Sequence, residues 1–363
     1  MKRISPAICS GCVFISMALK SDGTVRAWGV GTLGDGNRRG SNTPVQVQDL
    51  SEVTAIASRQ ALRADGTVWT WGGNEHGRLG DGTNSPRFTP VQVKELSGVI
   101  AISQGLALRA DGTVWAWGWN PDGQLGDGTN KDRRTPVQVQ NSSGIMAVSN
   151  GGCNYSLALR EDGTVWAWGK NENGNLGDGT YENRGTPVQV SGLNGVMAIS
   201  AYHNSFALKK DGTVWAWGNN SIGGLGDGTT THRNAPVQVQ GLDGVTAISA
   251  GSAHTLALRN DGTVWAWGAN LHGQLGNGTA TEYDTVTHSH PPHPVPIQVQ
   301  NLNGVTAVSA GTQHSLALKN DGTVWAWGRN IDGELGDGTF VDKHSPVQVV
   351  GAGGKGFLKL NAN

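Results

Sequence analysis

The chain has 363 residues and a formal charge of −1, because its 27 basic side chains nearly balance its 28 acidic ones. Charged residues make up only 15% of it and no long run of like charge occurs, so it lacks the basic clusters that grip nucleic acid or an anionic membrane surface. Glycine is abundant, at 56 positions, but without the Gly-X-Y period of collagen. No apolar run reaches the roughly 18 residues of a membrane helix. We therefore expect neither nucleic acid nor a membrane among the partners.

The amino-terminal residues allow two interpretations. Two basic residues followed by a mildly apolar stretch have a faint likeness to a secretory signal. The same stretch also aligns with a later one, because "AICSGCVFISMALKSDG" (7–23) matches "AVSAGTQHSLALKNDG" (307–322). We interpret it as the start of a first repeat, which leaves the cellular compartment open.

The three cysteines do not form a disulfide framework for a chain of this size. Cys9 and Cys12 have the CxxC spacing of zinc ligands, but neither a second pair nor a histidine stands nearby to complete the site. We expect no metal there and no cofactor.

One phrase, "DGTVWAWG", returns seven times along the chain. The copies begin at Asp22, Asp65, Asp111, Asp162, Asp211, Asp261 and Asp321, and the first reads "DGTVRAWG". Their spacing, about 50 residues, suits propeller blades or helical solenoids. No window keeps the apolar spacing of a helix. Instead the repeat consists of short β-branched, aromatic and alternating runs bounded by Gly, Asn or Asp, which is typical of strands.

Each unit contains four such runs, of the kind "VTAIS", "HTLAL", "TVWAW" and "VQV". The Asp-Gly pair between the second and third runs predicts a two-residue hairpin turn, because both residues tolerate a positive φ. Trp-Ala-Trp puts two rings on one face of the third strand, where we expect them to join neighbouring sheets. A proline precedes the fourth run in every copy, which suits an outer edge strand; these are Pro44, Pro90, Pro136, Pro187, Pro236, Pro296 and Pro346.

A four-stranded sheet cannot bury both of its faces alone, so we expect the units to pack side by side in a closed ring. The predicted fold is all-β: a single seven-bladed β-propeller with four antiparallel strands per blade. Its repeats are residues 4–50, 51–96, 97–142, 143–193, 194–242, 243–302 and 303–350, followed by a tail at 351–363. Either the amino-terminal segment "RISPAIC" (3–9) or the tail supplies the innermost strand of blade one, and we favour the amino-terminal segment.

The consensus "GVxAISAGxxHSLALxxDGTVWAWGxNxxGQLGDGT" resembles the repeat of the RCC1 family, the seven-bladed propellers named after the regulator of chromosome condensation. The resemblance covers about residues 4–350, and the even, Trp-rich copies are most similar to bacterial members. It implies the propeller fold but not one function, since the family includes a nucleotide-exchange factor, a plant ultraviolet receptor and a β-lactamase inhibitor.

Strand direction predicts that the turns after the first and third strands emerge on one face of the disc, and that this face carries most of the variation between copies. The loop "TATEYDTVTHSHPPHPVP" (279–296) of blade six is longer than its equivalents. The first turns of blades two and three, within 53–62 and 99–108, are shorter than in the other copies. We expect a face that is low over blades two and three and raised over blade six. Insertions on a rigid scaffold are favoured binding elements.

The predicted partner-binding residues lie on that face. They are Tyr283, Asp284, His288, His290 and His293 in the long loop, and Tyr155, Tyr202 and His203 in the first turns. Tyrosine and histidine offer adaptable, partly apolar contacts. The three histidines of the loop could converge on a metal, but neighbouring prolines stiffen the segment, and we predict no metal site.

The other polar motifs have structural explanations. The aspartates of the "LGDGT" turns lack the distant glutamate of a calcium loop, and we expect them to cap backbone N–H groups. His254 and His314 precede the second strand, where we expect turn histidines bonded to the backbone. No nucleophile, metal-protease or phosphate-binding motif occurs, so we predict that the protein is not an enzyme.

The sequence thus predicts a monomeric, non-enzymatic module that binds a protein partner through its variable loops. The resemblance leaves two alternatives open: a proteinaceous enzyme inhibitor, and a guanine-nucleotide exchange factor for a small GTPase. The chain lacks the Gly-Trp-Arg-His-Thr repeats of the plant receptor, so we do not expect light sensing.

Overall fold

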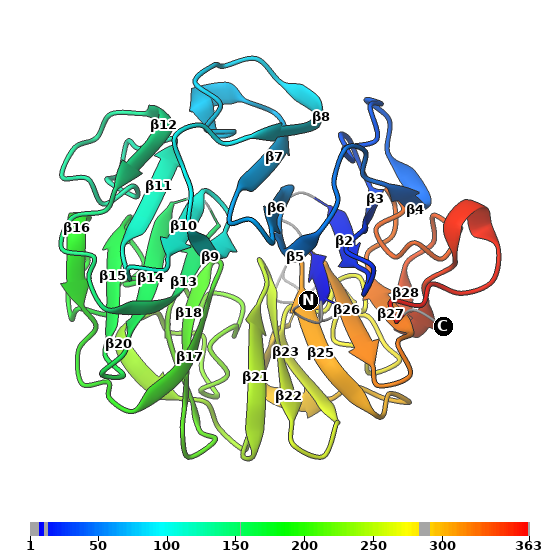
Figure 1. Ribbon diagram of the computed structural model, residues 1–363. Coiled ribbons are helices and arrows are strands. Elements are labelled where there is room, and N and C mark those ends of the chain that lie inside the picture. The colour runs from blue at the N-terminus through cyan, green and yellow to red at the C-terminus, as the bar shows by residue number, and fades with distance from the viewer. Residues whose placement is uncertain (1–6, 11–13, 153, 283–290, 362–363) are drawn as a thin grey trace.

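The computed structural model describes residues 7–10, 14–152, 154–282 and 291–361, which form seven four-stranded antiparallel sheets arranged in a ring (Figure 1). Each sheet uses four consecutive strands, so the order in the sheet follows the order in the chain. The predicted seven-bladed propeller is confirmed. None of the helices in the described ranges has the length and apolar character that crossing a bilayer requires.

The blades follow one another along the chain. Blade one holds β1 (Ala7–Ser10), β2 (Ile15–Leu19), β3 (Val25–Gly29) and β4 (Ser41–Gln46); blade two holds β5 (Val53–Ala57), β6 (Gln60–Arg63), β7 (Val68–Gly72) and β8 (Arg87–Gln92). Blade three holds β9 (Val99–Ser103), β10 (Leu106–Arg109), β11 (Val114–Gly118) and β12 (Arg133–Gln138); blade four holds β13 (Ile145–Gly151), β14 (Tyr155–Arg160), β15 (Val165–Gly169) and β16 (Arg184–Gln189). Blade five holds β17 (Val196–Ala201), β18 (Asn204–Lys209), β19 (Val214–Gly218) and β20 (Arg233–Gln238).

Blade six holds β21 (Val245–Ala250), β22 (His254–Arg259), β23 (Val264–Gly268) and β24 (His293–Gln298); blade seven holds β25 (Val305–Ala310), β26 (His314–Lys319), β27 (Val324–Gly328) and β28 (Lys343–Gln348). Two short 3-10 helices, η1 (Glu75–Gly77) and η2 (Ala352–Gly354), lie in loops. The first strands of successive blades contact each other around the ring, and β1 contacts both β5 and β25. The ring is closed at its inner wall.

The Asp-Gly hairpins have three-residue loops. In blade two, Gly66 N donates to the Arg63 carbonyl and Arg63 N donates to the Thr67 carbonyl, which encloses residues 64–66. The Asp65 carboxylate accepts hydrogen bonds from Thr67 N and Oγ1, at 2.9 and 2.6 Å. Only the glycine, with φ 79°, takes a left-handed conformation. The expected two-residue turn is therefore wrong by one residue, because a glycine at the end of a three-residue loop satisfies the strand twist equally well.

The two tryptophans of each phrase have different roles. Trp117 is buried with Leu62 of the preceding blade, and its Nε1 donates to the Arg78 carbonyl of that blade at 3.1 Å. Trp115 is half-buried and packs against the same cluster, with the Arg109 guanidinium 5.5 Å from its ring centroid. The second ring of the phrase thus joins neighbouring sheets, as predicted. Burial of one such side chain stabilises the fold by about 2–3 kcal/mol.

The conserved-looking proline of each copy lies inside the fourth strand rather than before it. Pro90 is the fourth residue of β8, which pairs with β7 through Thr70↔Val91 and Gly72↔Arg87. The register shifts between these two pairs, so the proline sits at an irregularity of an edge strand, where a missing N–H is tolerated. The predicted start of the fourth strand is therefore wrong by four residues.

Both chain ends contribute to the closure at blade one. The amino-terminal β1 takes the innermost place, as we favoured. The carboxy-terminal tail bridges blades seven and one. Leu360 N donates to the Gly322 carbonyl of blade seven, and Ser21 N of blade one donates to the Leu360 carbonyl, both at 2.9 Å. The linker between blades six and seven makes the equivalent hydrogen bonds. Val305 N donates to the Gly262 carbonyl of blade six, and the Gly304 carbonyl accepts from Asn320 N of blade seven. No linker joins blades seven and one, because they are the last and the first along the chain. The tail makes the hydrogen bonds that a linker makes at the other junctions.

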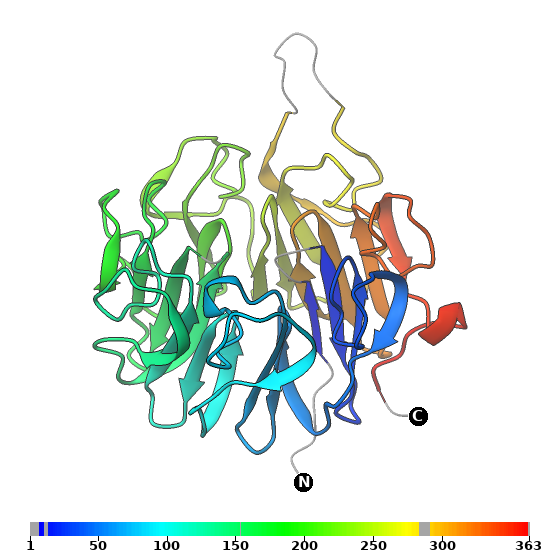
Figure 2. The same ribbon diagram turned by 90° about the horizontal axis from the view of Figure 1, so that it is seen from above.

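The tail is held by apolar contacts as well. Leu358 and Leu360 are buried in a cluster with Leu335 of blade seven and Trp28 of blade one. The helix η2 at the start of the tail lies against β4 (Figures 1 and 2). The sequence had presented the two ends as competitors for the innermost place of blade one; β1 takes that place, and the tail seals the junction of blades seven and one instead.

Candidate partner-binding face

The variable face is the end of the propeller that carries two kinds of connection. One kind is the turn between the first and second strands, which in blades two to seven spans residues 58–59, 104–105, 152–154, 202–203, 251–253 and 311–313. The other is the loop after the third strand, such as residues 73–86 of blade two and 119–132 of blade three. The Asp-Gly hairpins lie at the opposite end of the strands. As predicted, blades two and three are shortened here: the first two strands with their turn span 11 residues in each (53–63 and 99–109), against 14 to 16 in blades four to seven.

A recess opens where the turns are short. It has a volume of about 290 Å³ and is lined by residues of blades two and three, with one, Asn150, from blade four. We call it the blade 2–3 recess; its lining includes Ser58, Arg59, Gln60, Thr70, Trp71, Glu75, Arg78, Leu79, Gln104, Leu106, Trp117, Trp119, Gln124 and Asn150. The expected low sector over blades two and three is therefore present and hollow.

Gln60 and Thr70 distinguish the recess from the equivalent place in every other blade. Gln60 of β6 and Thr70 of β7 are directly opposite each other in this antiparallel strand pair. In the other six blades the same pair is apolar in both members: Met17 and Ala27, Leu106 and Ala116, Leu157 and Ala167, Phe206 and Ala216, Leu256 and Ala266, and Leu316 and Ala326. Blade two thus places two polar side chains at a core position of the repeat.

The two polar side chains differ in how they are satisfied. Thr70 Oγ1 donates to the Leu79 carbonyl at 2.7 Å. Gln60 is only 2% exposed, and within the described part of the chain neither its amide nitrogen nor its amide oxygen has a hydrogen-bond partner. An unpaired buried polar group costs about 1–3 kcal/mol, so most buried amides in folded proteins are bonded to protein or to ordered water.

Trp71 is a second unpaired donor beside the recess. Its Nε1 has no acceptor among the residues that the structure describes, whereas Trp168 and Trp217 donate to carbonyls of the preceding blade at 2.9 Å. The difference follows from blade one, whose chain has three residues between Gly29 and Leu33 where blade three has six between Gly118 and Leu125. The shorter loop does not bring a carbonyl to the Trp71 indole.

The mouth of the recess carries charge and an aromatic ring. Arg78 is exposed and makes no ion pair with any described residue. Arg59 lies in the two-residue turn with φ 59°, and Ser58 before it has φ 23°, so a tight left-handed turn presents the arginine. Glu75 is the acidic residue of the lining, and Trp119 is half-buried. Two guanidinium groups against one carboxylate make the mouth net positive.

The predicted contact residues are not all surface groups. Tyr155 is 3% exposed and belongs to the core of blades four and five, where its hydroxyl hydrogen-bonds to Ser205 Oγ at 3.0 Å. Its assignment as a partner-contacting residue is therefore a correction: the ring fills the space between two blades. Burial raises the pKa of the Tyr155 hydroxyl well above its usual range.

Tyr202 and His203 lie together on the variable face of blade five, with ring centroids 5.2 Å apart. His203 is exposed, and its Nδ1 is 3.3 Å from Ser252 Oγ of blade six. His293 is half-buried at the start of β24, opposite Gly268. The other four predicted residues, Tyr283, Asp284, His288 and His290, lie outside the described residues. The structure thus brings one of the predicted groups together, the Tyr202–His203 pair.

Sequence reasoning missed the chemistry of the recess. It identified the short turns but named no residue there, because its choices (tyrosines, histidines and Asp284) all lay in blades four, five and six. Two signals were available: Trp119 is the one tryptophan outside the repeated phrase, and "QALR" in blade two breaks the apolar pattern of the second strand. Reading the repeats position by position would have selected Gln60.

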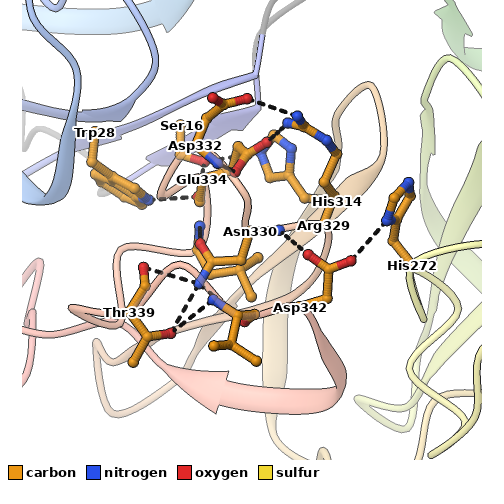
Figure 3. A network of polar contacts seen from close by, with 12 residues as sticks. Ser16, Trp28, His272, His314, Arg329, Asn330, Asp332, Glu334, Thr339 and Asp342 are labelled. Atoms are coloured by element: carbon orange, nitrogen blue, oxygen red, sulfur yellow. Dashed lines mark hydrogen bonds and ion pairs between the residues drawn. The ribbon is translucent and has the colours of Figure 1, made fainter.

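A second polar cluster lies at the junction of blades seven and one (Figure 3). Glu334 stands where blades three and six have Gln124 and Gln274, and it is fully buried. Its carboxylate pairs with Arg329, which also contacts Asp332 at 2.7 Å. Burial raises the pKa of Glu334, and the Arg329 charge opposes that rise.

The main chain at Glu334 joins the two blades. Its carbonyl accepts hydrogen bonds from Ser16 Oγ at 2.7 Å and from Trp28 Nε1 at 2.8 Å (Figure 3). His314 Nε2 lies 2.9 Å from the same Ser16 hydroxyl, and burial lowers the pKa of His314 to about 3, so the ring is neutral. We call this set the blade 7–1 junction. The Glu334 carboxylate is ion-paired and the Glu334 carbonyl is hydrogen-bonded, as expected of a group that stabilises the fold.

His254 and His314 are structural, but the expected backbone bond is wrong. His254 Nε2 lies 2.7 Å from Ser315 Oγ of the next blade, as His314 does from Ser16. Tyr155 makes the same kind of contact to Ser205. In blades four, six and seven the first residue of the second strand therefore links adjacent blades through a serine side chain.

The aspartates of the "LGDGT" turns act as caps, as predicted. Asp127 Oδ1 accepts hydrogen bonds from Thr129 N and Oγ1, and Oδ2 forms an ion pair with Arg133 at 2.6 Å. Asp81 and Asp227 repeat the arrangement in blades two and five. Across the described ranges, no three His, Cys, Asp or Glu side chains are grouped so as to hold a metal ion.

The sequence profile of the regulator of chromosome condensation (RCC1) repeat matches residues 65–106, 111–159, 162–204, 211–258, 261–318 and 321–361, which is most of the chain. The chain belongs to the RCC1-repeat family. Each match starts at an Asp-Gly hairpin, so the sequence repeat takes the two outer strands of one blade and the two inner strands of the next.

Two curated relatives share this repeat. The ultraviolet-B receptor UVR8 of Arabidopsis thaliana is 32% identical over 206 residues, which cover 54% of this chain and 44% of UVR8. The human E3 ubiquitin-protein ligase HERC2 is 31% identical over 351 residues, which cover 93% of this chain and 5% of HERC2. The chain thus spans less than half of the one relative and a small part of the other.

Two solved structures have the same fold. Prp20p of Saccharomyces cerevisiae superposes with a TM-score of 0.80 at 24% identity, covering 92% of this chain and 87% of Prp20p. Human WBSCR16 gives a TM-score of 0.78 at 24% identity, covering 91% of this chain and 94% of WBSCR16. These likenesses show the architecture and leave the surface chemistry to this chain's own residues.

Proposed function

We propose that this propeller is a protein-binding module that carries out no chemistry of its own and engages its partner through the variable face. The observation that carries the proposal is the blade 2–3 recess. It combines a cavity of about 290 Å³ with two groups that have no counterpart among the described residues: a buried amide without a hydrogen-bond partner and an arginine without an ion pair. Loops of blades two and three contribute to its lining, and rigid scaffolds commonly carry their binding groups on loops.

Two further observations support binding over catalysis. The titratable clusters near the face, such as Glu334 with Arg329, are paired within the protein and buried between blades. Prp20p, which shares the fold, is described as binding Gsp1p and histones, so a propeller of this architecture can serve as a protein-binding surface. Interfaces of standard size bury about 800 Å² on each partner, and a disc face of seven blades offers that area.

Affinity capture with matched charge reversals tests the proposal. Four immobilised forms are compared: the intact chain, Arg78→Glu at the recess, Glu161→Arg in the hairpin of blade four, and a version that lacks residues 283–292, which precede β24. Arg78 and Glu161 are both exposed, so neither reversal disturbs the core. Bound proteins are identified by mass spectrometry and their affinities are measured with purified material.

We expect one protein that the intact chain and Glu161→Arg retain and that Arg78→Glu loses, with a Kd at least tenfold weaker. Loss with the deletion as well would extend the contact to blade six. Equal retention by all four forms would place recognition away from the variable face and contradict the proposal. If the partner is a small GTPase or another enzyme, nucleotide-release or inhibition assays on the purified pair distinguish exchange or inhibition from simple binding.

A further inference from the structure

The blade 2–3 recess has the groups that recognise a carboxylate. Gln60 lines it with a buried amide that has no partner among the described residues. Arg78 and Arg59 bring two guanidinium groups to its lining, against the single carboxylate of Glu75. A guanidinium binds a carboxylate with two parallel hydrogen bonds, and an amide N–H₂ adds a neutral donor. The excess of donors over acidic groups selects an anionic, acceptor-rich ligand.

The walls of the recess favour a ligand whose charged group is attached to methylene groups. Trp71, Trp117 and Trp119 line it together with Leu106. Trp119 is half-buried, so part of its ring remains available to a ligand. Methylene groups pack well on indole faces, whereas a bare inorganic anion leaves those faces without contact. The volume of about 290 Å³ accommodates an amino-acid side chain with part of its backbone.

The position of Gln60 argues that the polar floor has a purpose. The same position is Met, Leu or Phe in the six other blades, and its cross-strand neighbour is Ala in all six. An apolar pair is therefore compatible with this fold at this place. A glutamine there leaves a buried amide unsatisfied unless something enters the recess to bond it.

We infer that the blade 2–3 recess binds the carboxylate side chain of a glutamate in an exposed acidic segment of the partner protein. Arg78 holds the carboxylate at the mouth, Gln60 donates to it from the floor, and the tryptophans enclose its methylene groups. This inference rests on the proposed function and names the anchor of the interface. It is tested on the recess alone, so it can fail while capture of a partner through other parts of the variable face succeeds.

A titration followed by NMR provides the test. The protein is labelled with ¹⁵N at tryptophan, and the indole signal of Trp119 is assigned from Trp119→Phe. The probes are N-acetyl-glutamate N-methylamide, its neutral glutamine analogue and inorganic phosphate. We expect saturable shifts of the Trp119 signal with the glutamate compound, a Kd in the millimolar range that suits so small a ligand, and binding at least tenfold weaker for the other two probes.

Three variants make the outcome decisive. Gln60→Leu with Thr70→Ala restores the apolar pair of the other blades, so it should fold normally and bind at least tenfold more weakly. Arg78→Gln should weaken binding about fivefold, and Arg39→Gln, an exposed arginine outside the recess, should leave it unchanged. Absence of saturable binding, equal binding of the glutamine analogue or of phosphate, or undiminished binding by the apolar-pair variant would each overturn the inference.

Discussion

The blade 7–1 junction and the blade 2–3 recess both break the repeat with polar residues at buried positions, and they do so in opposite ways. At the junction, Glu334 replaces glutamine and is paired with Arg329. In the recess, Gln60 replaces an apolar residue and has no hydrogen-bond partner in the described chain. The comparison teaches that a buried polar substitution completed within the protein serves the fold, whereas an incomplete one indicates a molecule from outside.

The largest expected effect comes from breaking the pair at the junction. Arg329→Met leaves the Glu334 carboxylate buried without its cation, which should lower the free energy of unfolding by about 3–5 kcal/mol. Burial already raises the pKa of Glu334, and removal of Arg329 raises it further. The folded variant then binds more protons than the unfolded chain, so its stability should fall as pH rises from 5 to 8. Urea unfolding at both pH values measures this.

The matched control is the double variant Arg329→Met with Glu334→Gln, which reproduces the glutamine of blades three and six. It should recover most of the lost stability and show no such pH dependence. Equal destabilisation in the single and double variants would mean that the Arg329 side chain acts through packing, and the junction would then not be an example of an internally completed charge.

The next effect tests how the tail seals the same junction. Leu360 is fully buried, and Leu360→Ala should lower the free energy of unfolding by about 2–5 kcal/mol, because a cavity opens between blades seven and one. Phe357→Ala in the same tail is the control: its ring is 59% exposed, so a change within about 0.5 kcal/mol is expected. Similar losses from both variants would show that the tail contributes without specific packing.

The buried histidines should make the protein sensitive to acid. Burial lowers the pKa of His314 and of His254 to about 3, below the value of about 6.5 in an unfolded chain. The unfolded chain therefore binds more protons as pH falls from about 6 towards 4, and each histidine should lower the free energy of unfolding by about 1.4 kcal/mol per pH unit. His314→Asn, which copies Asn204 of blade five, should remove one such contribution. An unchanged slope between pH 6 and 4 would contradict the neutral, buried ring.

The smallest effect has the opposite sign and belongs to the recess. Gln60→Leu with Thr70→Ala removes the unsatisfied amide and should raise the free energy of unfolding by about 1–2 kcal/mol, while it weakens binding of the glutamate probe at least tenfold. Guanidinium unfolding measures the gain. A loss of stability would show that the Gln60 amide is satisfied within the protein, and the contrast between junction and recess would disappear.

The sequence predicted where the blade 2–3 recess lies, but it did not identify the residues that line it. The short turns of blades two and three predicted a low sector, and the structure has a recess there. Tyr155 was misjudged because its turn looks variable in sequence, while its ring fills a space between blades. Gln60 was overlooked because a single glutamine at the start of a strand looks like surface polarity until its burial is known.

The sequence by itself determined the fold, because seven copies of one strand pattern cannot bury their faces except against each other. It also determined the hairpins and the capping aspartates, which depend on neighbours two residues away. Only the tertiary structure decided how the two chain ends share blade one, which histidine meets which serine, and that Gln60 is enclosed without a partner. Those outcomes depend on contacts between blades, where residues tens or hundreds of positions apart in the chain meet, and no local pattern encodes them.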